Sequence, residues 1–262
     1  MELVVADAGG GRGDGGFEAG GVGWCDVLPL RGKRYNSANV YDDALAVMPV
    51  TAITKAITTL QAAEQRFNLV RTADPAFFSE WYTDLPEITA AATATLDRIR
   101  ARYRYHRAQG HLAESLVNLV VLSPLLELAG FYDPPFVMRG EAAVELELTR
   151  RMNETTAETL RGRIDFLVIS RGLWVAVLES KGTEINVDVA LPQVLAYMMT
   201  SPEPQRPRFG LVTNGGEFFF VKVMGVETPQ YDVSRVFSHL PLRNELYEVL
   251  RILQQIGGRF LE

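Results

Sequence analysis

Cysteine and histidine are scarce in this sequence of 262 residues, which has one cysteine, Cys25, and three histidines. A single cysteine excludes an intramolecular disulfide framework and suits a reducing compartment, so we expect a cytoplasmic protein. His106, His111 and His239 do not have the spacing of a zinc site. The sequence also contains no Gly-x-Ser-x-Gly and no Cys/His nucleophile pattern, which argues against the hydrolases that use them.

Excess positive charge and long apolar runs are missing as well. The net charge is −6, so any surface for nucleic acid would have to be a local basic patch. The longest apolar run, residues 116–126, is interrupted by polar residues and is too short to cross a bilayer. The N-terminus lacks the basic-then-apolar order of a signal peptide, so no membrane partner is expected. A hydrophobic fraction of 47% still allows a substantial core.

The first part of the chain is rich in glycine: ten of the 22 glycines fall within the first 32 residues. Gly11, Gly13 and Gly16 match the spacing of a dinucleotide-binding loop, but the residues that follow cannot supply the helix that such a loop opens. We therefore expect residues 1–47 to be a flexible extension, with Met48 as a candidate natural start.

Apolar spacing divides the rest of the chain. Residues 48–110 have helical spacing, and we expect a helical N-terminal region there. Residues 111–235 are expected to form the core, and residues 236–262 a C-terminal helix that packs on it. Within the core we expect a helix at 111–128, strands at 143–148, 164–169 and 173–178, a helix at 190–200 and a hairpin at 209–223 around Asn214-Gly215. This order predicts an α/β sandwich with a central mixed sheet flanked by helices.

Two of the expected strands end in charged residues that a hairpin would bring together. Asp165 and Glu179 lie at equal distances on either side of Gly172, so a hairpin centred there places them opposite each other. Directly opposed residues have Cβ atoms about 4.5–5.5 Å apart, and two such carboxylates repel unless a cation or a proton lies between them. Lys181 is two residues beyond Glu179 and shares its face of the strand. An alternative is that these residues are strand-end charges facing solvent, with Lys181 as a neutralising partner.

The pattern resembles the PD-(D/E)xK nuclease superfamily, in which an Asp begins one strand of a hairpin and E-x-K lies on the next. The matching residues are Asp165 and Glu179-Ser180-Lys181, with Ile164 in place of the usual proline. Together with Glu114, Gly162-Arg163-Ile164-Asp165 and Thr213-Asn214-Gly215, they resemble the N-terminal nuclease region of type I restriction enzyme R subunits. They also resemble short restriction-endonuclease-like bacterial proteins. The R subunits continue into a helicase motor, but no Walker-type phosphate loop occurs here, so no translocation is expected.

The resemblance implies roles for these residues. Asp165 and Glu179 would bind Mg²⁺, or Mn²⁺, with the Ser180 carbonyl as a further ligand and Glu114 holding a metal-bound water or a second ion. Lys181 would orient the attacking water and stabilise the transition state.

Other residues are candidates for binding the substrate. Gln193 and Tyr197 form the Q-x-x-x-Y seen in exonuclease-like branches and would position the scissile strand, although such a pair is as often a helix packing contact. Arg161 and Arg163 flank Asp165 and could grip phosphates. The run 98–107 holds five arginines and two tyrosines, which suits either nucleic acid or a solvated, salt-bridged helix face.

The sequence therefore predicts a metal-dependent DNA nuclease without a helicase motor. Two alternatives stay open: a non-catalytic nucleic-acid-binding module on a nuclease fold, and a structural or interaction domain whose acidic cluster is incidental. Besides DNA, the expected partners are a second copy of the chain in a homodimer or other restriction or defence subunits.

Overall fold

The computed structural model describes residues 50–149, 157–170, 173–180, 182–183 and 186–261. For residues 146–149, 157–158 and 173–180 the description covers the backbone only. The expected flexible extension at 1–47 and the side chain of Lys181 lie outside the described residues. The rest belongs to one compact unit within Ala46–Glu262.

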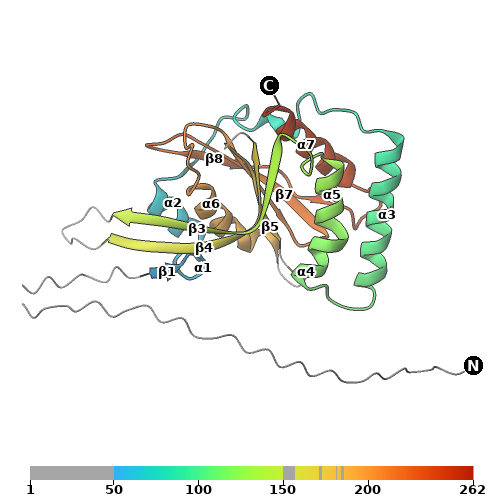
Figure 1. Cartoon of the computed structure of the whole chain (residues 1–262), viewed down its shortest axis with the longest axis horizontal. Helices are drawn as coiled ribbons and strands as arrows, with labels where there is room; N and C mark the ends of the chain where they lie inside the picture. Colours follow the sequence, from blue (N-terminus) through green and yellow to red (C-terminus); the bar gives the residue numbers. More distant parts are fainter. Residues whose placement is uncertain (1–49, 150–156, 171–172, 181, 184–185, 262) are drawn as a thin grey trace, which may run out of the picture. The chain divides into compact units, whose positions relative to one another are not determined.

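The described residues form one mixed sheet of nine strands (Figure 1). Its order is β1 (Val50–Ala52), β4 (Ala157–Ser170), β5 (Leu173–Ser180), β6 (Arg208–Thr213), β7 (Glu217–Met224), β8 (Gln230–Val233) and β2 (Val70–Arg71). Two strands lie off this path: β3 (Phe136–Thr149) pairs with β4, and β9 (Phe237–Ser238) pairs with β7. The pairs β1–β4, β5–β6 and β2–β8 are parallel, and the others are antiparallel.

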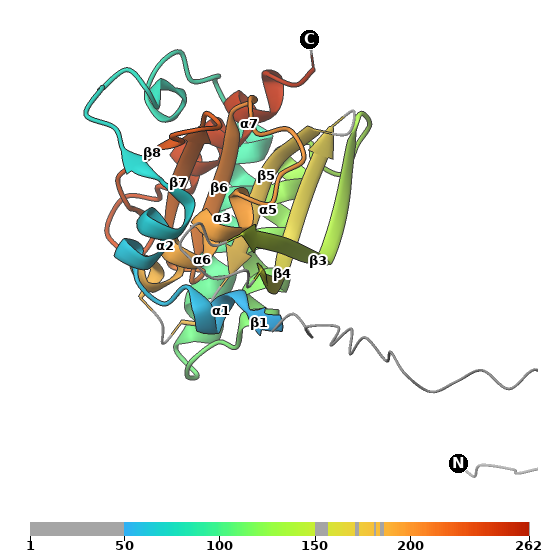
Figure 2. The same cartoon turned by 90° about the vertical axis from the view of Figure 1, so that its left-hand side faces the viewer.

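Helices cover both faces of the sheet, and each face has its own apolar core. One face packs against α3 (Ala90–Arg107), α4 (Glu114–Val117), α5 (Ser123–Leu128) and α7 (Leu246–Gly258), together with the 3-10 turn Ser79–Trp81. The other packs against α1 (Ile53–Ala56), α2 (Leu60–Phe67), the 3-10 turn Val187–Ala190 and α6 (Leu191–Met198). Figure 2 shows α1, α2 and α6 on the side opposite to α3 and α5. A helix–sheet–helix arrangement confirms the expected α/β class.

One helical run carries the chain from Glu114 to Leu128, and it contains a single wide π turn at Asn118–Leu122. Pro124 explains the irregularity, because it has no N–H to donate to the carbonyl of Val120. The backbone N–H of Ser123 bonds to the carbonyl of Asn118, five residues earlier, and not to that of Leu119, its regular helical partner. Such turns are frequent at functional sites.

The structure corrects several predicted boundaries. The region expected to be helical also contains β1 and β2, which pair with strands more than a hundred residues away. Helix α7 begins only at Leu246, within the range 236–262 expected for the C-terminal helix, because side chains of α3 hold the backbone carbonyls of residues 239–242 outside a helix. Helix α3 begins at Ala90, where Thr89 accepts a hydrogen bond from the N–H of Ala92 as its N-cap. No helix among the described residues combines the length and hydropathy needed to cross a membrane.

Candidate active site

The β4–β5 hairpin carries the two carboxylates that the sequence singles out. Its strands pair antiparallel, as expected, and Phe166 pairs with Leu178. Going away from the turn, Asp165 on β4 and Glu179 on β5 are the positions one residue beyond this last pair. A bulge after Val168 shifts the other end of the hairpin by one residue. The symmetry about Gly172 therefore holds at the end that carries the acidic residues and fails near the turn.

Neighbouring residues bear on the face of the sheet at each of these positions. Leu167, two residues after Asp165, packs into the core beneath α6. The backbone of Glu179 pairs with Val212 of β6, which belongs to the same core. Asp165 itself is partly buried. Ile164, directly before Asp165, packs into that core as well, so the regular alternation of β4 is broken between Ile164 and Leu167. The side chain of Glu179 lies outside the described residues.

Glu114 and the nearby Leu112 lie close to the segment that follows β5. Just beyond the E-x-K segment, the N–H of Thr183 donates to the carbonyl of Leu112 at 3.1 Å, and Thr183 Oγ1 accepts from the N–H of Leu112 at 2.9 Å. A Cβ on Gly182 would lie 3.9 Å from the backbone nitrogen of Glu114. These contacts bring the first residue of α4, whose side chain is exposed, to the segment that follows Lys181.

Gln193 and Tyr197 lie on α6 and contact each other. Gln193 Nε2 donates to Tyr197 Oη at 2.7 Å, and the tyrosine is only 2% exposed. Its ring packs on Gly162 of β4, where an added Cβ would lie 2.5 Å from Tyr197 Cε1. The pair therefore stabilises the α6–β4 contact three residues from Asp165, and its role in positioning a substrate stays a prediction.

The two arginines that flank Asp165 are paired across the β3–β4 ladder. Arg161 contacts Glu145 at 3.2 Å, and Arg163 contacts Glu141 at 3.0 Å. All four side chains are half-exposed or more. A phosphate would have to displace these glutamates from the arginines. Phosphate binding by Arg161 and Arg163 therefore stays a prediction. Solvent screening makes such pairs weak, typically below about 1 kcal/mol each.

The Thr213-Asn214-Gly215 segment forms the turn expected between β6 and β7, with Gly215 at a φ of 85°. Thr213 pairs with Ser180, so this turn adjoins the E-x-K segment. His239 stabilises this turn by a hydrogen bond: its Nε2 lies 2.6 Å from the carbonyl oxygen of Gly215. Burial lowers the pKa of this imidazole. Nothing in the sequence indicated that a histidine twenty-four residues away would hold the turn.

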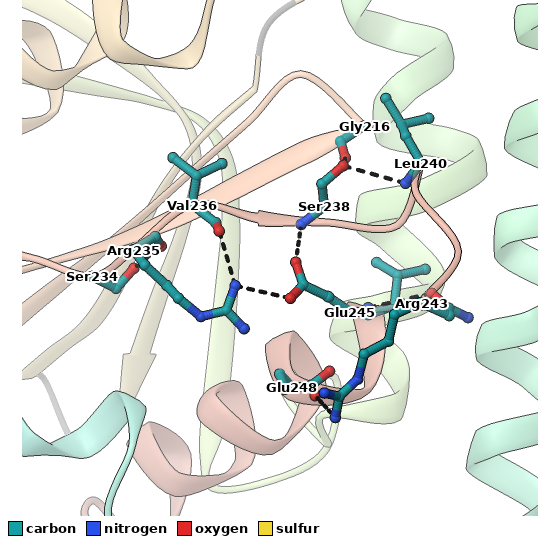
Figure 3. Close-up of polar contacts among 11 residues, drawn as sticks. Gly216, Ser234, Arg235, Val236, Ser238, Leu240, Arg243, Glu245 and Glu248 are labelled. Carbon is teal, nitrogen blue, oxygen red and sulfur yellow. Dashed lines mark hydrogen bonds and ion pairs between the residues drawn. The ribbon is translucent and has the colours of Figure 1, made fainter.

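Further polar contacts tie the same turn to the start of α7 (Figure 3). Ser238 Oγ donates to the carbonyl of Gly216 at 3.0 Å, and the N–H of Ser238 donates to Glu245 at 2.7 Å. Glu245 also pairs with Arg235 at 2.9 Å. The close-up therefore shows a scaffold that fixes the turn, and each of these polar groups is used within the fold.

Asn118 is a polar residue near Glu114 that no sequence motif indicates. It lies one helical turn after Glu114, on the same side of the helix, at the start of the π turn. Its Oδ1 is enclosed and has no hydrogen-bond partner among the described residues. A buried, unsatisfied oxygen costs about 1–3 kcal/mol, which is the kind of cost that functional sites carry.

The donor set fits a hard cation better than a soft one. Among the described side chains, which do not include that of Glu179, no group of three or more His, Cys, Asp or Glu could hold a metal ion. The residues at the site offer carboxylate, amide and backbone carbonyl oxygens, which suit Mg²⁺ or Mn²⁺ and not Zn²⁺.

Comparison with known proteins adds a distant structural neighbour. No family model matches the chain, and no curated protein matches it. Among solved structures, the chain is similar to a fragment assigned as an HsdR subunit of a type I restriction enzyme from Vibrio vulnificus YJ016. The two are 19% identical with a TM-score of 0.35, over 56% of this chain and 26% of that one. This chain thus spans about a quarter of the length of that neighbour.

Proposed function

We propose that this chain is a metal-dependent nuclease that hydrolyses phosphodiester bonds of DNA on a restriction-endonuclease-like sandwich. The register of the β4–β5 hairpin carries the proposal, because it makes Asp165 and Glu179 successors of the same cross-strand pair. Two carboxylates at adjacent positions repel each other, and a bound cation between them would relieve that repulsion.

Each residue has a distinct part in the proposed reaction. Asp165 and Glu179 would hold Mg²⁺ or Mn²⁺, with the Ser180 carbonyl as a further ligand and Glu114 acting from α4. The metal would supply Lewis acidity toward the phosphate and a more acidic water. Lys181 would orient that water and offset the charge that develops on the phosphate.

The surrounding side chains would bind the substrate and support the site. Gln193 would contact the substrate while Tyr197 keeps it in position. Arg161 and Arg163 would exchange their glutamate partners for phosphates. Asn118 is a further polar candidate, since its free oxygen lies one turn from Glu114.

The proposal is tested by incubating the protein with linear duplex, circular duplex and single-stranded DNA, with and without Mg²⁺ or Mn²⁺. We expect cleavage that needs the metal and disappears in Asp165→Asn. Asp133→Asn is a matched control, because Asp133 is an exposed aspartate that follows α5, outside the candidate active site.

The outcomes separate the candidate functions. DNA binding without cleavage in the parent would favour a non-catalytic nucleic-acid-binding module. Metal affinity that is equal in the parent and in Asp165→Asn would favour an interaction domain with an incidental acidic cluster.

A further inference from the structure

Helix α3 uses its basic residues in two different ways. On the side toward the body, Arg100 Nε donates to the carbonyl of His239 at 2.7 Å, and Arg104 donates to the carbonyl of Leu240 at 2.7 Å. Arg100 also bonds to the carbonyl of Pro241. Tyr103, on the same side, is buried in the core. These three residues stabilise the fold, and they leave the rest of the arginine-tyrosine run unexplained.

The opposite side of α3 carries Arg98, Arg102 and Tyr105, which we name the α3 outer face. Their spacing of four and then three residues puts them on one side of the helix, away from the buried Leu96 and Ile99. Arg102 makes no hydrogen bond or ion pair within the described part of the chain, and Arg98 bonds only to Thr95 one turn earlier. The side chains of the α3 outer face therefore make few polar contacts within the described part of the protein.

Tyr105 is the unusual member of the α3 outer face. Its side chain is 67% exposed, and one edge contact with the His106 ring, at 5.3 Å and 77°, supports it. An aromatic ring on a surface helix loses favourable burial unless a partner covers it. A flat ring beside two arginines offers a stacking platform next to cationic groups.

Charge and position both connect this face to the candidate active site. The 18 residues of α3 contain five arginines and one aspartate, in a chain whose net charge is −6. The C-terminal end of α3 leads within a few residues to Leu112, which bonds to Thr183 beyond the E-x-K segment. Figure 1 shows this end of α3 beside the start of α4.

We propose that the α3 outer face binds a single-stranded segment of nucleic acid and guides it toward the candidate active site. Arg98 and Arg102 contact successive phosphates, and an unpaired base stacks on Tyr105. An acidic peptide would satisfy the arginines equally well, but it would leave the exposed ring without a partner. A duplex would not present a base face to the ring. This inference rests on the proposed nuclease function, whose substrate it makes more specific.

Binding is measured with the full chain in metal-free buffer, by fluorescence anisotropy of a labelled single-stranded oligonucleotide over a series of salt concentrations. Tyr105→Ala is expected to raise Kd about tenfold, equivalent to about 1.4 kcal/mol, while Tyr105→Phe keeps the ring and stays near the parent. Arg102→Ala is expected to lower the slope of log K against log salt by about 0.7, the value for one phosphate contact. Arg206→Ala removes an exposed arginine far from α3 in the sequence and should leave both quantities unchanged.

Three results would overturn the proposal: no binding by the parent, equal affinity in Tyr105→Ala and the parent, or displacement of the oligonucleotide by polyglutamate with no effect of Tyr105→Ala. The last result would assign the face to an acidic protein segment. Asp165→Asn distinguishes this test from that of catalysis. It should bind the oligonucleotide at least as tightly as the parent, because it removes a negative charge, even though it loses cleavage.

Discussion

At the scale of single residues, we expect substitutions of Asp165 and Glu179, at the end of the β4–β5 hairpin, to have opposite effects on stability and on function. Asp165→Asn removes one of two neighbouring negative charges, so the free energy of unfolding in metal-free buffer should stay the same or rise slightly. The same change should abolish Mg²⁺ or Mn²⁺ binding, because an amide is a poor ligand for a hard divalent cation. Calorimetric metal titration, run beside chemical denaturation, measures both.

Lys181→Ala is the comparison variant for this prediction. It should keep the metal affinity of the parent and slow cleavage sharply, because it removes charge stabilisation in the transition state and not a ligand. If Asp165→Asn binds the metal as tightly as the parent, the assignment of the site is wrong.

A second prediction at this scale concerns the stability of a variant at Gly162. A methyl group there would lie 2.5 Å from Tyr197 Cε1 and 2.9 Å from Ile53 Cδ1, so α6 or α1 must move away from β4. We expect Gly162→Ala to lower the free energy of unfolding by about 1–3 kcal/mol, the usual cost of overpacking. Gly258→Ala is the matched control, since a Cβ there meets no atom within 4 Å. Equal stability of the two variants would show that the α6–β4 contact is looser than described.

At the scale of elements, the strongest sequence patterns predicted the structure well. The hairpin around Asn214-Gly215, the antiparallel β4–β5 pair and α6 were all expected, because each has a clear period or a specific turn residue within a short stretch. Strands β1, β2, β8 and β9 were missed, since two to four residues cannot show a period, and distant partners create each strand.

The candidate site was predictable only where its geometry is local. The register of a short hairpin follows from residue spacing, so the neighbouring positions of Asp165 and Glu179 could be inferred. The approach of Glu114 depends on hydrogen bonds between Leu112 and Thr183, seventy-one residues apart, which no local pattern reports. For the same reason the glutamate partners of Arg161 and Arg163 were not foreseen.

The π turn in the helical run from Glu114 to Leu128 makes a prediction about Asn118. Replacing Asn118, whose Oδ1 is enclosed and unpartnered, with leucine should leave the free energy of unfolding within about 1 kcal/mol of the parent, because that oxygen has no hydrogen bond to lose. Cleavage should fall if the Oδ1 atom serves the active site. Thermal denaturation and the DNA assay separate the two effects. A large loss of stability with full cleavage would instead give Asn118 a purely structural role.

At the scale of the whole molecule, one buried acid connects three distant parts of the chain. Glu80 is 1% exposed and contacts Lys222 Nζ at 2.7 Å and Arg259 at 3.3 Å. Lys222 also donates to the carbonyl of Phe77 at 2.6 Å. The segment before α3, the centre of the sheet and the end of α7 therefore meet at this carboxylate.

This connection predicts a strongly non-additive pair of substitutions. Lys222→Met should lower the free energy of unfolding by about 3 kcal/mol, because it leaves a buried carboxylate with one weaker partner. Adding Glu80→Leu should recover part of the loss, since the unpaired charge is then gone. A double-mutant cycle by chemical denaturation measures the coupling. If the two losses simply add, the ion pair does not contribute as described.

His239 predicts how stability varies with pH. Burial lowers the pKa of its imidazole below the usual 6.5, and Arg100 and Arg104 lower it further, although the bond to Gly215 acts the other way. Above that usual value the imidazole is neutral in both states. As the pH falls below about 6.5, the unfolded chain takes up the proton first, so stability is lost. His239→Gln should therefore show a shallower fall in the free energy of unfolding between about pH 7 and pH 5. An identical slope in the two proteins would contradict this.

Strand β3 pairs with β4 along its whole length, and on its other side no strand of the described chain covers it. Such an open edge invites another chain to add to the sheet, which is a common route to aggregation. Here Glu141 interrupts the ladder with a φ of 48°, and exposed charges at Arg139 and Glu145 line the same strand. The residues beside the candidate active site therefore also protect the protein from edge-to-edge self-association, and variants that neutralise Glu141 or Glu145 should lose solubility before they lose their fold.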